Sequence, residues 1–241
     1  MKILKSLIRV LNYAVIALLL LVVSIEAPFV HKKYIRNIAE ESTVQIYGAK
    51  GTGSGSHVTF KNKTVILTNK HVCELADSSG FIEVERVDKI RVKRKVIKRD
   101  EKHDLCIIEG IKGVKGISIA KDAEIGETFY TLGHPRGDKL TVADGEYIGE
   151  EIIQLASPVV NGLCNGRLEK VQVWFFEIEL CVQDFESVQF STPTYPGNSG
   201  SPIVNKYGNL VAVVFAGNPQ IENMGFGVPL RFVKRFLSES I

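Results

Sequence analysis

Short runs of alternating or β-branched residues, broken by turn residues, fill the chain from Ser42 onward and constrain its fold more than any other feature. The first runs are TVQIYGA, HVTF, TVILT, FIEVERV, KIRVKRKVI, LCIIEGI and ETFYTLG. A second series contains YIGEEIIQLA, VQVWFFEIELCV, SVQFST, SPIVN and LVAVVFA. Runs of this length and spacing are typical of β-sandwiches and β-barrels. The sequence therefore predicts an all-β protein made of two successive β units.

The two units are expected at about residues 40–120 and 125–228, joined by a crossover within 115–126. The last segment, PLRFVKRFLSES, opens with a proline and repeats apolar residues at helical spacing. It predicts a docked helix over residues 229–240. The content of 45% hydrophobic and 24% charged residues matches folded soluble proteins and argues against disorder and a polytopic membrane protein.

The N-terminus has a targeting pattern, because three basic residues precede an apolar stretch from Ala14 to Ile25. The stretch is shorter than the roughly 20 residues that cross a bilayer comfortably, and no small-x-small cleavage site follows it. Residues 1–36 are thus expected to be a signal peptide or a membrane anchor with a short linker. The remaining domain, residues 37–241, is expected on the extracytoplasmic side of the membrane.

The charge balance gives no reason to expect nucleic acid as a partner. The chain has 30 Lys and Arg against 27 Asp and Glu, and three of the bases lie in residues 1–25, which contain no acid. The folded part is therefore formally neutral, whereas nucleic-acid binding needs a basic surface.

A serine between glycines, in the segment PGNSGSP, stands directly before the apolar strand that begins at Ile203. Glycines allow the tight turn that exposes a nucleophilic hydroxyl. They also leave the amides of Gly197 and Ser199 free to bind a developing oxyanion. The same letters are compatible with an ordinary hairpin turn.

Two further segments supply a histidine and an aspartate. VILTNKHV carries His71 at the end of an apolar run, and HDLCII carries Asp104 at the start of another. Along the chain the order is His71, Asp104, Ser199. Each residue alone fits a structural role, whereas the three together fit nucleophilic catalysis with a general base.

These segments resemble the trypsin-like serine proteases, and the HtrA-like branch most closely. The resemblance rests on ILTNKHV, HDLCII, PGNSGSPIV, MGFGVPLRFV and the glycine-rich stretch Gly51–Ser56, and it covers about residues 40–238. It implies two packed six-stranded antiparallel β-barrels. His71 and Asp104 would come from the first barrel and Ser199 from the second.

The resemblance also implies a reaction. The chain would be a serine endopeptidase that cleaves unfolded or extended polypeptides through an acyl-enzyme, without a cofactor. His71 would act as general base, Asp104 would orient it, and the turn Gly197, Asn198, Ser199 would form the oxyanion hole. The alternatives are an inactive trypsin-fold module that binds peptides and an esterase for small acyl groups.

Departures from the family affect activation and specificity. Asn198 stands where digestive trypsins carry an aspartate that pairs with a newly cut N-terminus, so activation by trimming is not expected. Pro193 stands where trypsin needs an acid, which disfavours basic side chains in the primary pocket. The resemblance assigns that pocket to apolar residues, for which core packing is an equally good interpretation: Val214, Phe215, Ala216 and Phe226.

The cysteines suggest one bridge and no metal site. Cys164 and Cys181 flank a hairpin-like segment, and a disulfide across its base is expected in an exported protein. Cys106 lies in an apolar strand and is interpreted as a buried thiol. The cysteines and histidines lack paired ligand spacing.

Two other histidines are given no catalytic role. His103 is expected to point away from Asp104 into solvent, and His134 is interpreted as structural. Only 12 residues follow Pro229, so the PDZ domains common in HtrA-like proteins are not expected. No feature supports a homo-oligomer.

Overall fold

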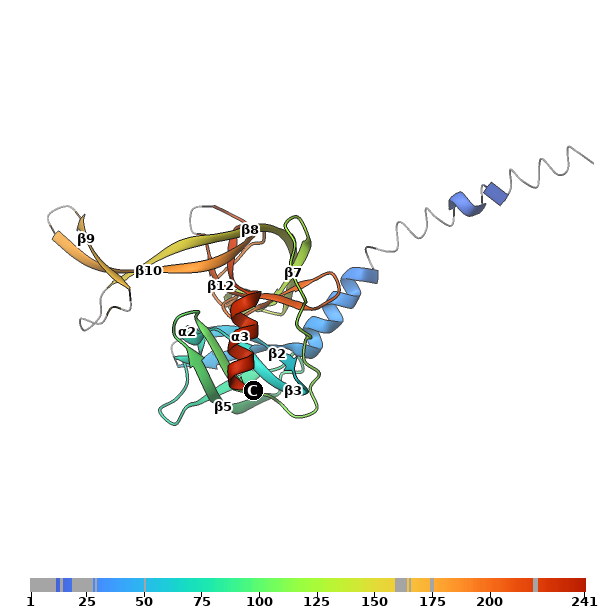
Figure 1. The fold of residues 1–241 in the computed structure, drawn as a ribbon. Helices are drawn as coiled ribbons and strands as arrows, with labels where there is room; N and C mark the ends of the chain where they lie inside the picture. Colours follow the sequence, from blue (N-terminus) through green and yellow to red (C-terminus); the bar gives the residue numbers. More distant parts are fainter. Residues whose placement is uncertain are drawn as a thin grey trace, which may run out of the picture.

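The computed structural model describes residues 12–13, 15–18, 28, 30–49, 51–158, 164, 166–173, 176–218 and 221–241. The first β unit is a closed barrel with the strand order β1-β2-β3-β6-β5-β4 (Figure 1). Its strands are β1 (Thr43–Gly48), β2 (Gly51–Phe60), β3 (Lys63–Thr68), β4 (Phe81–Glu85), β5 (Arg91–Asp100) and β6 (Leu105–Glu109). All their pairings are antiparallel.

The second unit is an antiparallel sheet with the order β13-β12-β11-β7-β8-β10-β9. Its strands are β7 (Thr128–Gly133), β8 (Thr141–Pro158), β9 (Arg167–Val173), β10 (Phe176–Phe190), β11 (Pro202–Asn205), β12 (Leu210–Gly217) and β13 (Gly225–Pro229). Because β10 also pairs with β13, six strands form a ring and β9 is added outside it. The all-β prediction is confirmed, but this sheet has seven strands rather than six.

Strands such as β6 read as continuous apolar runs because both of their faces are buried. Cys106 and Ile108 point into the core of the first barrel. Leu105 and Ile107 belong to a second core, which also contains Leu132 and other residues of the second sheet. This shared core joins the two β units and gives the boundary between them a fixed geometry.

Two helical segments cover the shared core. Residues 30–42 are helical, and Ile35 and Ala39 of this segment are fully buried. Helix α3 (Leu230–Ser240) buries one apolar face that includes Phe236 and Leu237, which agrees with the predicted terminal helix. The helix over residues 30–42 was not predicted from the sequence.

The outer parts of β8, β9 and β10 form an arm that projects from the body of the protein (Figure 1). Ile152 on this arm is 69% exposed, and several other apolar side chains there are also exposed. The run VQVWFFEIELCV, predicted as one strand, is divided between β9 and β10, which pair with each other. No glycine or proline marks that division in the sequence.

The cysteines form two disulfides. Cys164 and Cys181, the pair expected from the sequence, are joined with an S–S distance of 2.05 Å. Cys73 and Cys106 are joined as well, so the interpretation of Cys106 as a free buried thiol was wrong. The second bridge depends on the pairing of β3 with β6, which sets Thr68 opposite Cys106 and brings the segment that contains Cys73 beside β6.

The predicted signal peptide or anchor falls mostly outside the described residues. Among the described residues, no helix is long and apolar enough to cross a membrane.

Candidate active site

His71 and Asp104 form a closely coupled pair. Nδ1 of His71 lies 2.8 Å from Oδ2 of Asp104, and the His71 backbone amide donates to Oδ1 at 3.0 Å. The carboxylate therefore holds the histidine through both its ring and its main chain. With Nδ1–H donated to Asp104, the Nε2 atom of His71 is the nitrogen left to accept a proton.

Hydrogen bonds and a disulfide join the segment that contains His71 to the segment that contains Asp104. His71 lies in the short helix α2 (Lys70–Cys73), and the Asn69 side chain and the Lys70 amide both donate to the Asp104 carbonyl oxygen. Asp104 has a φ of 51°, a left-handed conformation that non-glycine residues adopt only where their surroundings impose it. The Cys73–Cys106 disulfide adds a covalent link two residues beyond each member of the pair.

The predicted nucleophile lies in a tight turn between β10 and β11. The Asn198 amide donates to the Tyr195 carbonyl oxygen at 3.0 Å, and Gly197 between them has a φ of 93°. Proline followed by a glycine of positive φ is the pattern of a type II turn. Within the described residues, the amides of Gly197 and Ser199 donate no hydrogen bond, so both are available to an oxyanion.

The nucleophile turn packs against the first barrel at Gly53. A β-carbon on Gly53 would lie 2.7 Å from Val72, next to His71, and 3.4 Å from the Ser199 carbonyl oxygen. Only glycine permits this close approach between α2, β2 and the turn. No hydrogen bond joins the His71 ring to the half-buried Ser199 hydroxyl among the described residues, and such bonds are often long without a substrate.

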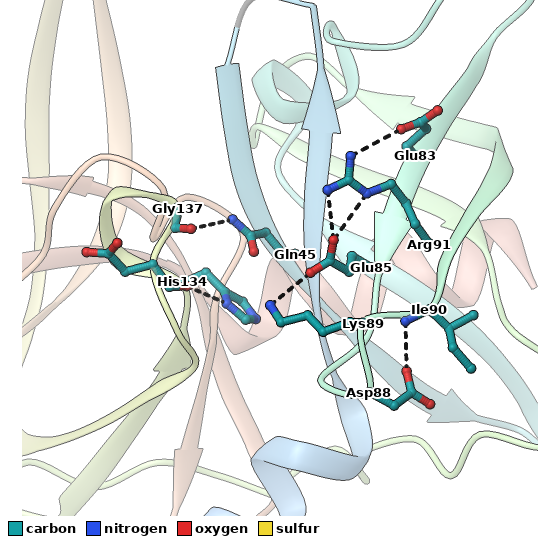
Figure 2. Close-up of polar contacts among 10 residues, drawn as sticks. Gln45, Glu83, Glu85, Asp88, Lys89, Ile90, Arg91, His134 and Gly137 are labelled. Carbon is teal, nitrogen blue, oxygen red and sulfur yellow. Dashed lines mark hydrogen bonds and ion pairs between the residues drawn. The ribbon is translucent and has the colours of Figure 1, made fainter.

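The turn after β7 lies against the Gly197 side of the nucleophile turn. The Arg136 amide donates to the Pro196 carbonyl oxygen at 2.6 Å, and Arg136 itself has a φ of 57°. Figure 2 shows the other side of this turn, where Gln45 from β1 donates to the Gly137 carbonyl oxygen at 2.9 Å. The first barrel therefore holds the segment after β7, and that segment holds the Pro196 carbonyl oxygen.

His134 opens this turn and is buried, in agreement with its interpretation as structural. Burial lowers the pKa of His134, although its ring also contacts the Asp138 carbonyl oxygen. Nearby, the buried Glu85 receives hydrogen bonds from Lys89 and Arg91 (Figure 2). Burial acts to raise the pKa of Glu85, but these two cations outweigh it and the pKa is lowered.

The four residues assigned to the primary pocket lie on β12 and β13. Val214, Phe215 and Phe226 are buried in the apolar cores, and Ala216 packs against one of them. A cavity of about 340 Å³ opens instead beside these strands. Its described lining consists of Pro193, Thr194, Tyr195, Asn218, Ile221, Glu222, Asn223 and Met224.

A second histidine–aspartate pair adjoins the first and was missed from the sequence. His103 is only 9% exposed, with Nδ1 at 2.7 Å from Oδ2 of Asp100. Its ring stacks on Phe232 of α3, and Arg235 of the same helix lies 3.0 Å from Nε2. The prediction that His103 faces solvent was wrong, because α3 covers this side of the strand.

Comparisons with known proteins agree with this geometry. A family model described as a trypsin-like peptidase domain matches residues 53–213. The serine protease Do-like HtrA of Bacillus subtilis is 26% identical over 222 residues, which cover 85% of this chain and 45% of that protein. A serine protease HtrA-like protein of Staphylococcus aureus is 26% identical over 77% of this chain and 23% of its own length. The chain thus spans less than half the length of these curated relatives.

Solved structures share the fold. An active-form protease from M. tuberculosis superposes with a TM-score of 0.65 at 20% identity, over 86% of this chain and 83% of that one. The serine endoprotease from Yersinia pestis gives 0.62 at 19% identity, over 85% and 66%. Fold, matched motifs and relatives agree that the chain belongs to the trypsin-like peptidase family.

Proposed function

We propose that this chain hydrolyses peptide bonds in extended polypeptides with His71, Asp104 and Ser199 as its catalytic triad. One observation carries the proposal: Asp104 accepts hydrogen bonds from both the ring and the main chain of His71, and within the described part of the chain the amides of Gly197 and Ser199 have no acceptor. A general base and an oxyanion hole are the two parts that acyl transfer from a serine requires.

The chemistry follows from these positions. Ser199 Oγ attacks the substrate carbonyl carbon, and its proton passes to Nε2 of His71. The negative charge that develops on the carbonyl oxygen is stabilised by the amides of Gly197 and Ser199. When the intermediate collapses, the leaving amine takes the proton from His71 and an acyl-enzyme forms on Ser199. Water then attacks the ester by the same route in reverse.

Two cavities support an extended substrate. One of about 560 Å³ lies between the turn that precedes Asp104 and the arm, with Lys102, Arg167 and Phe185 in its lining. The other is the cavity of about 340 Å³ beside Pro193. We infer that an extended polypeptide bound at Ser199 places side chains in both cavities. The four assigned pocket residues remain a prediction of apolar preference.

The disulfides support an extracytoplasmic compartment. Two bridges in one chain are expected in an oxidising environment, and they agree with the targeting pattern of the N-terminus. We place the domain on the extracytoplasmic side, with the leader as a signal peptide or anchor.

A fluorophosphonate probe tests the proposal on the full-length protein, read by intact mass and peptide mapping. We expect one adduct, on Ser199, that is absent in Ser199→Ala. The control Ser187→Ala removes a buried hydroxyl that hydrogen-bonds to the main chain of β8, and it should keep the adduct. No adduct on folded wild-type protein would overturn the proposal and favour the inactive peptide-binding alternative.

An assay for hydrolysis of an unfolded protein distinguishes the endopeptidase from the esterase alternative. Peptide-bond cleavage that disappears in Ser199→Ala supports the endopeptidase. Turnover of small esters without any cleavage of an unfolded protein would point to the esterase.

A further inference from the structure

The buried Ser54 of β2 contacts the nucleophile turn twice. Its side-chain hydroxyl donates to the Gly197 carbonyl oxygen at 2.7 Å. Its backbone amide donates to the Ser199 carbonyl oxygen at 2.8 Å. Both acceptors belong to the second β unit, whereas Ser54 belongs to the first. One residue of the first barrel therefore contacts both residues whose amides face the proposed oxyanion.

The direction of the Ser54 hydroxyl proton is determined by a third contact. The His134 amide donates to Ser54 Oγ at 3.0 Å, which occupies an acceptor position of that oxygen. A hydroxyl has one proton to donate, and the Gly197 carbonyl oxygen is its acceptor here. The Ser54 main chain is itself anchored, because the Thr68 hydroxyl donates to its carbonyl oxygen at 2.7 Å. The side chain is fully buried, so water does not compete for these bonds.

The order of the peptide units explains what these contacts do. A peptide unit is planar, so holding its carbonyl oxygen also sets the direction of its N–H. The Gly197 N–H belongs to the unit whose carbonyl is Pro196, held by Arg136. The Ser199 N–H belongs to the unit whose carbonyl is Asn198, held by the Ser201 amide at 2.9 Å.

Ser54 holds the two other peptide units of this turn, Gly197–Asn198 and Ser199–Gly200. The unit after Gly197 is held through the Gly197 carbonyl oxygen, and the unit after Ser199 through the Ser199 carbonyl oxygen. With a carbonyl fixed on each side of its α-carbon, Gly197 keeps its φ of 93° and its N–H keeps one direction. Without the hydroxyl, this unit would keep only the hydrogen bond from the Asn198 amide to the Tyr195 carbonyl oxygen, and Gly197 has no side chain to restrain its rotation.

We propose that Ser54 is a positioning residue for the oxyanion hole, whose hydroxyl orients the Gly197 amide from the opposite barrel. The inference rests on the proposed function, since it assigns a role within the same reaction. Ser54 does not touch the substrate. It acts through Gly197, so its loss should weaken stabilisation of the transition state and leave ground-state binding unchanged.

The test is the reaction of full-length protein with a fluorophosphonate probe, separated into the maximal inactivation rate constant and the half-saturating probe concentration. The phosphoryl oxygen develops its charge where the oxyanion would lie. We expect Ser54→Ala to lower the rate constant by about tenfold to a hundredfold, with half-saturation within about twofold of wild type. A loss confined to half-saturation would overturn the proposal.

The matched control is Ser187→Ala, which also removes a fully buried hydroxyl that donates to a main-chain carbonyl oxygen. Both variants should lower the thermal midpoint by similar amounts, but only Ser54→Ala should slow inactivation. Equal inactivation rates in the two variants would show that the Ser54 hydroxyl orients nothing.

A second variant keeps the test decisive if Ser54→Ala does not fold. Ser54→Cys has nearly the same shape and donates a weaker hydrogen bond, so it separates hydrogen bonding from packing. We expect an inactivation rate between those of wild type and Ser54→Ala, or several-fold below wild type if only this variant folds. A wild-type rate in Ser54→Cys would overturn the proposal. If wild-type protein itself fails to react at Ser199, the proposed function fails instead.

Discussion

The two β units hold their parts of the active site in different ways. In the first barrel, His71 and Asp104 are joined by two direct hydrogen bonds and by a disulfide two residues away, all within that barrel. In the second unit, the turn at Ser199 has no covalent link nearby, and its carbonyl oxygens at Gly197 and Ser199 are held by the first barrel. The proposed base is therefore oriented within one unit, whereas the proposed oxyanion hole depends on contacts between the two units.

The largest expected effect concerns the His71–Asp104 pair, whose contacts lie within the first barrel. Asp104→Asn should lower kcat by about 10⁴, because an amide can donate to the His71 ring and so stabilise the tautomer with the wrong nitrogen protonated. The measurement is steady-state hydrolysis of an unfolded protein by full-length enzyme, alongside the thermal midpoint.

The second histidine–aspartate pair provides the control. Asp100→Asn breaks the equivalent contact to His103 at 2.7 Å, but this pair fastens α3 and lies apart from the nucleophile turn. We expect a loss of kcat below about tenfold. Comparable losses in both variants would contradict the assignment of Asp104 as the catalytic aspartate.

Local patterns predicted the strands and suggested the three segments that we propose as catalytic, because each pattern depends on a few consecutive residues. The alternation in TVILT and LCIIE and the glycines around Ser199 are visible in the sequence itself. What was missed depends on contacts between distant elements. The burial of His103 requires α3, more than a hundred residues away in the chain, and the role inferred for Ser54 requires the second unit to be in place.

The disulfides also show that contacts between distant elements are not predicted by local patterns. Spacing suggested Cys164–Cys181, since both cysteines flank one hairpin, whereas Cys73–Cys106 joins residues that are brought together by the pairing of the non-consecutive strands β3 and β6. The hairpin of β9 and β10 lies where the spacing of these cysteines suggested one, although no glycine or proline in VQVWFFEIELCV marks where β9 ends and β10 begins.

Removing each disulfide sharpens the comparison between the body and the arm. Cys73→Ala combined with Cys106→Ala opens a bridge of sequence separation 33. By the chain-entropy relation it should lower the free energy of unfolding by about 3 to 4 kcal/mol. Because the bridge holds α2 to β6, kcat should fall as well. Urea unfolding and hydrolysis of an unfolded protein measure the two effects.

The matched double variant is Cys164→Ala with Cys181→Ala, which opens the bridge in the arm. We expect faster cleavage of the arm by an added protease and little change in kcat, since the arm contributes nothing to the His71–Asp104 pair. Equal losses of kcat in the two double variants would contradict the separation of roles between the bridges.

The smallest of these effects concerns His57, which is fully buried in β2, three residues from Ser54. Its Nδ1–H donates to the Ser42 carbonyl oxygen, and Nε2 accepts from the Ile111 amide, so the neutral ring is fully satisfied. Burial lowers the pKa of His57 from 6.5 to about 4. Protonation therefore favours the unfolded chain: stability is complete above pH 6.5 and is lost as the pH falls toward 4, by about 3 kcal/mol in all.

Urea unfolding of wild type and His57→Gln at pH 7 and pH 4 isolates this contribution from that of the carboxylates. The variant should be less stable than wild type at pH 7 but should lose about 3 kcal/mol less on acidification. The lowered pKa of His134 acts in the same direction in both proteins, so it cancels in the difference. Parallel pH dependences would contradict the assignment. A difference that does appear would show that His57 makes the first barrel, which carries the proposed base, sensitive to acid.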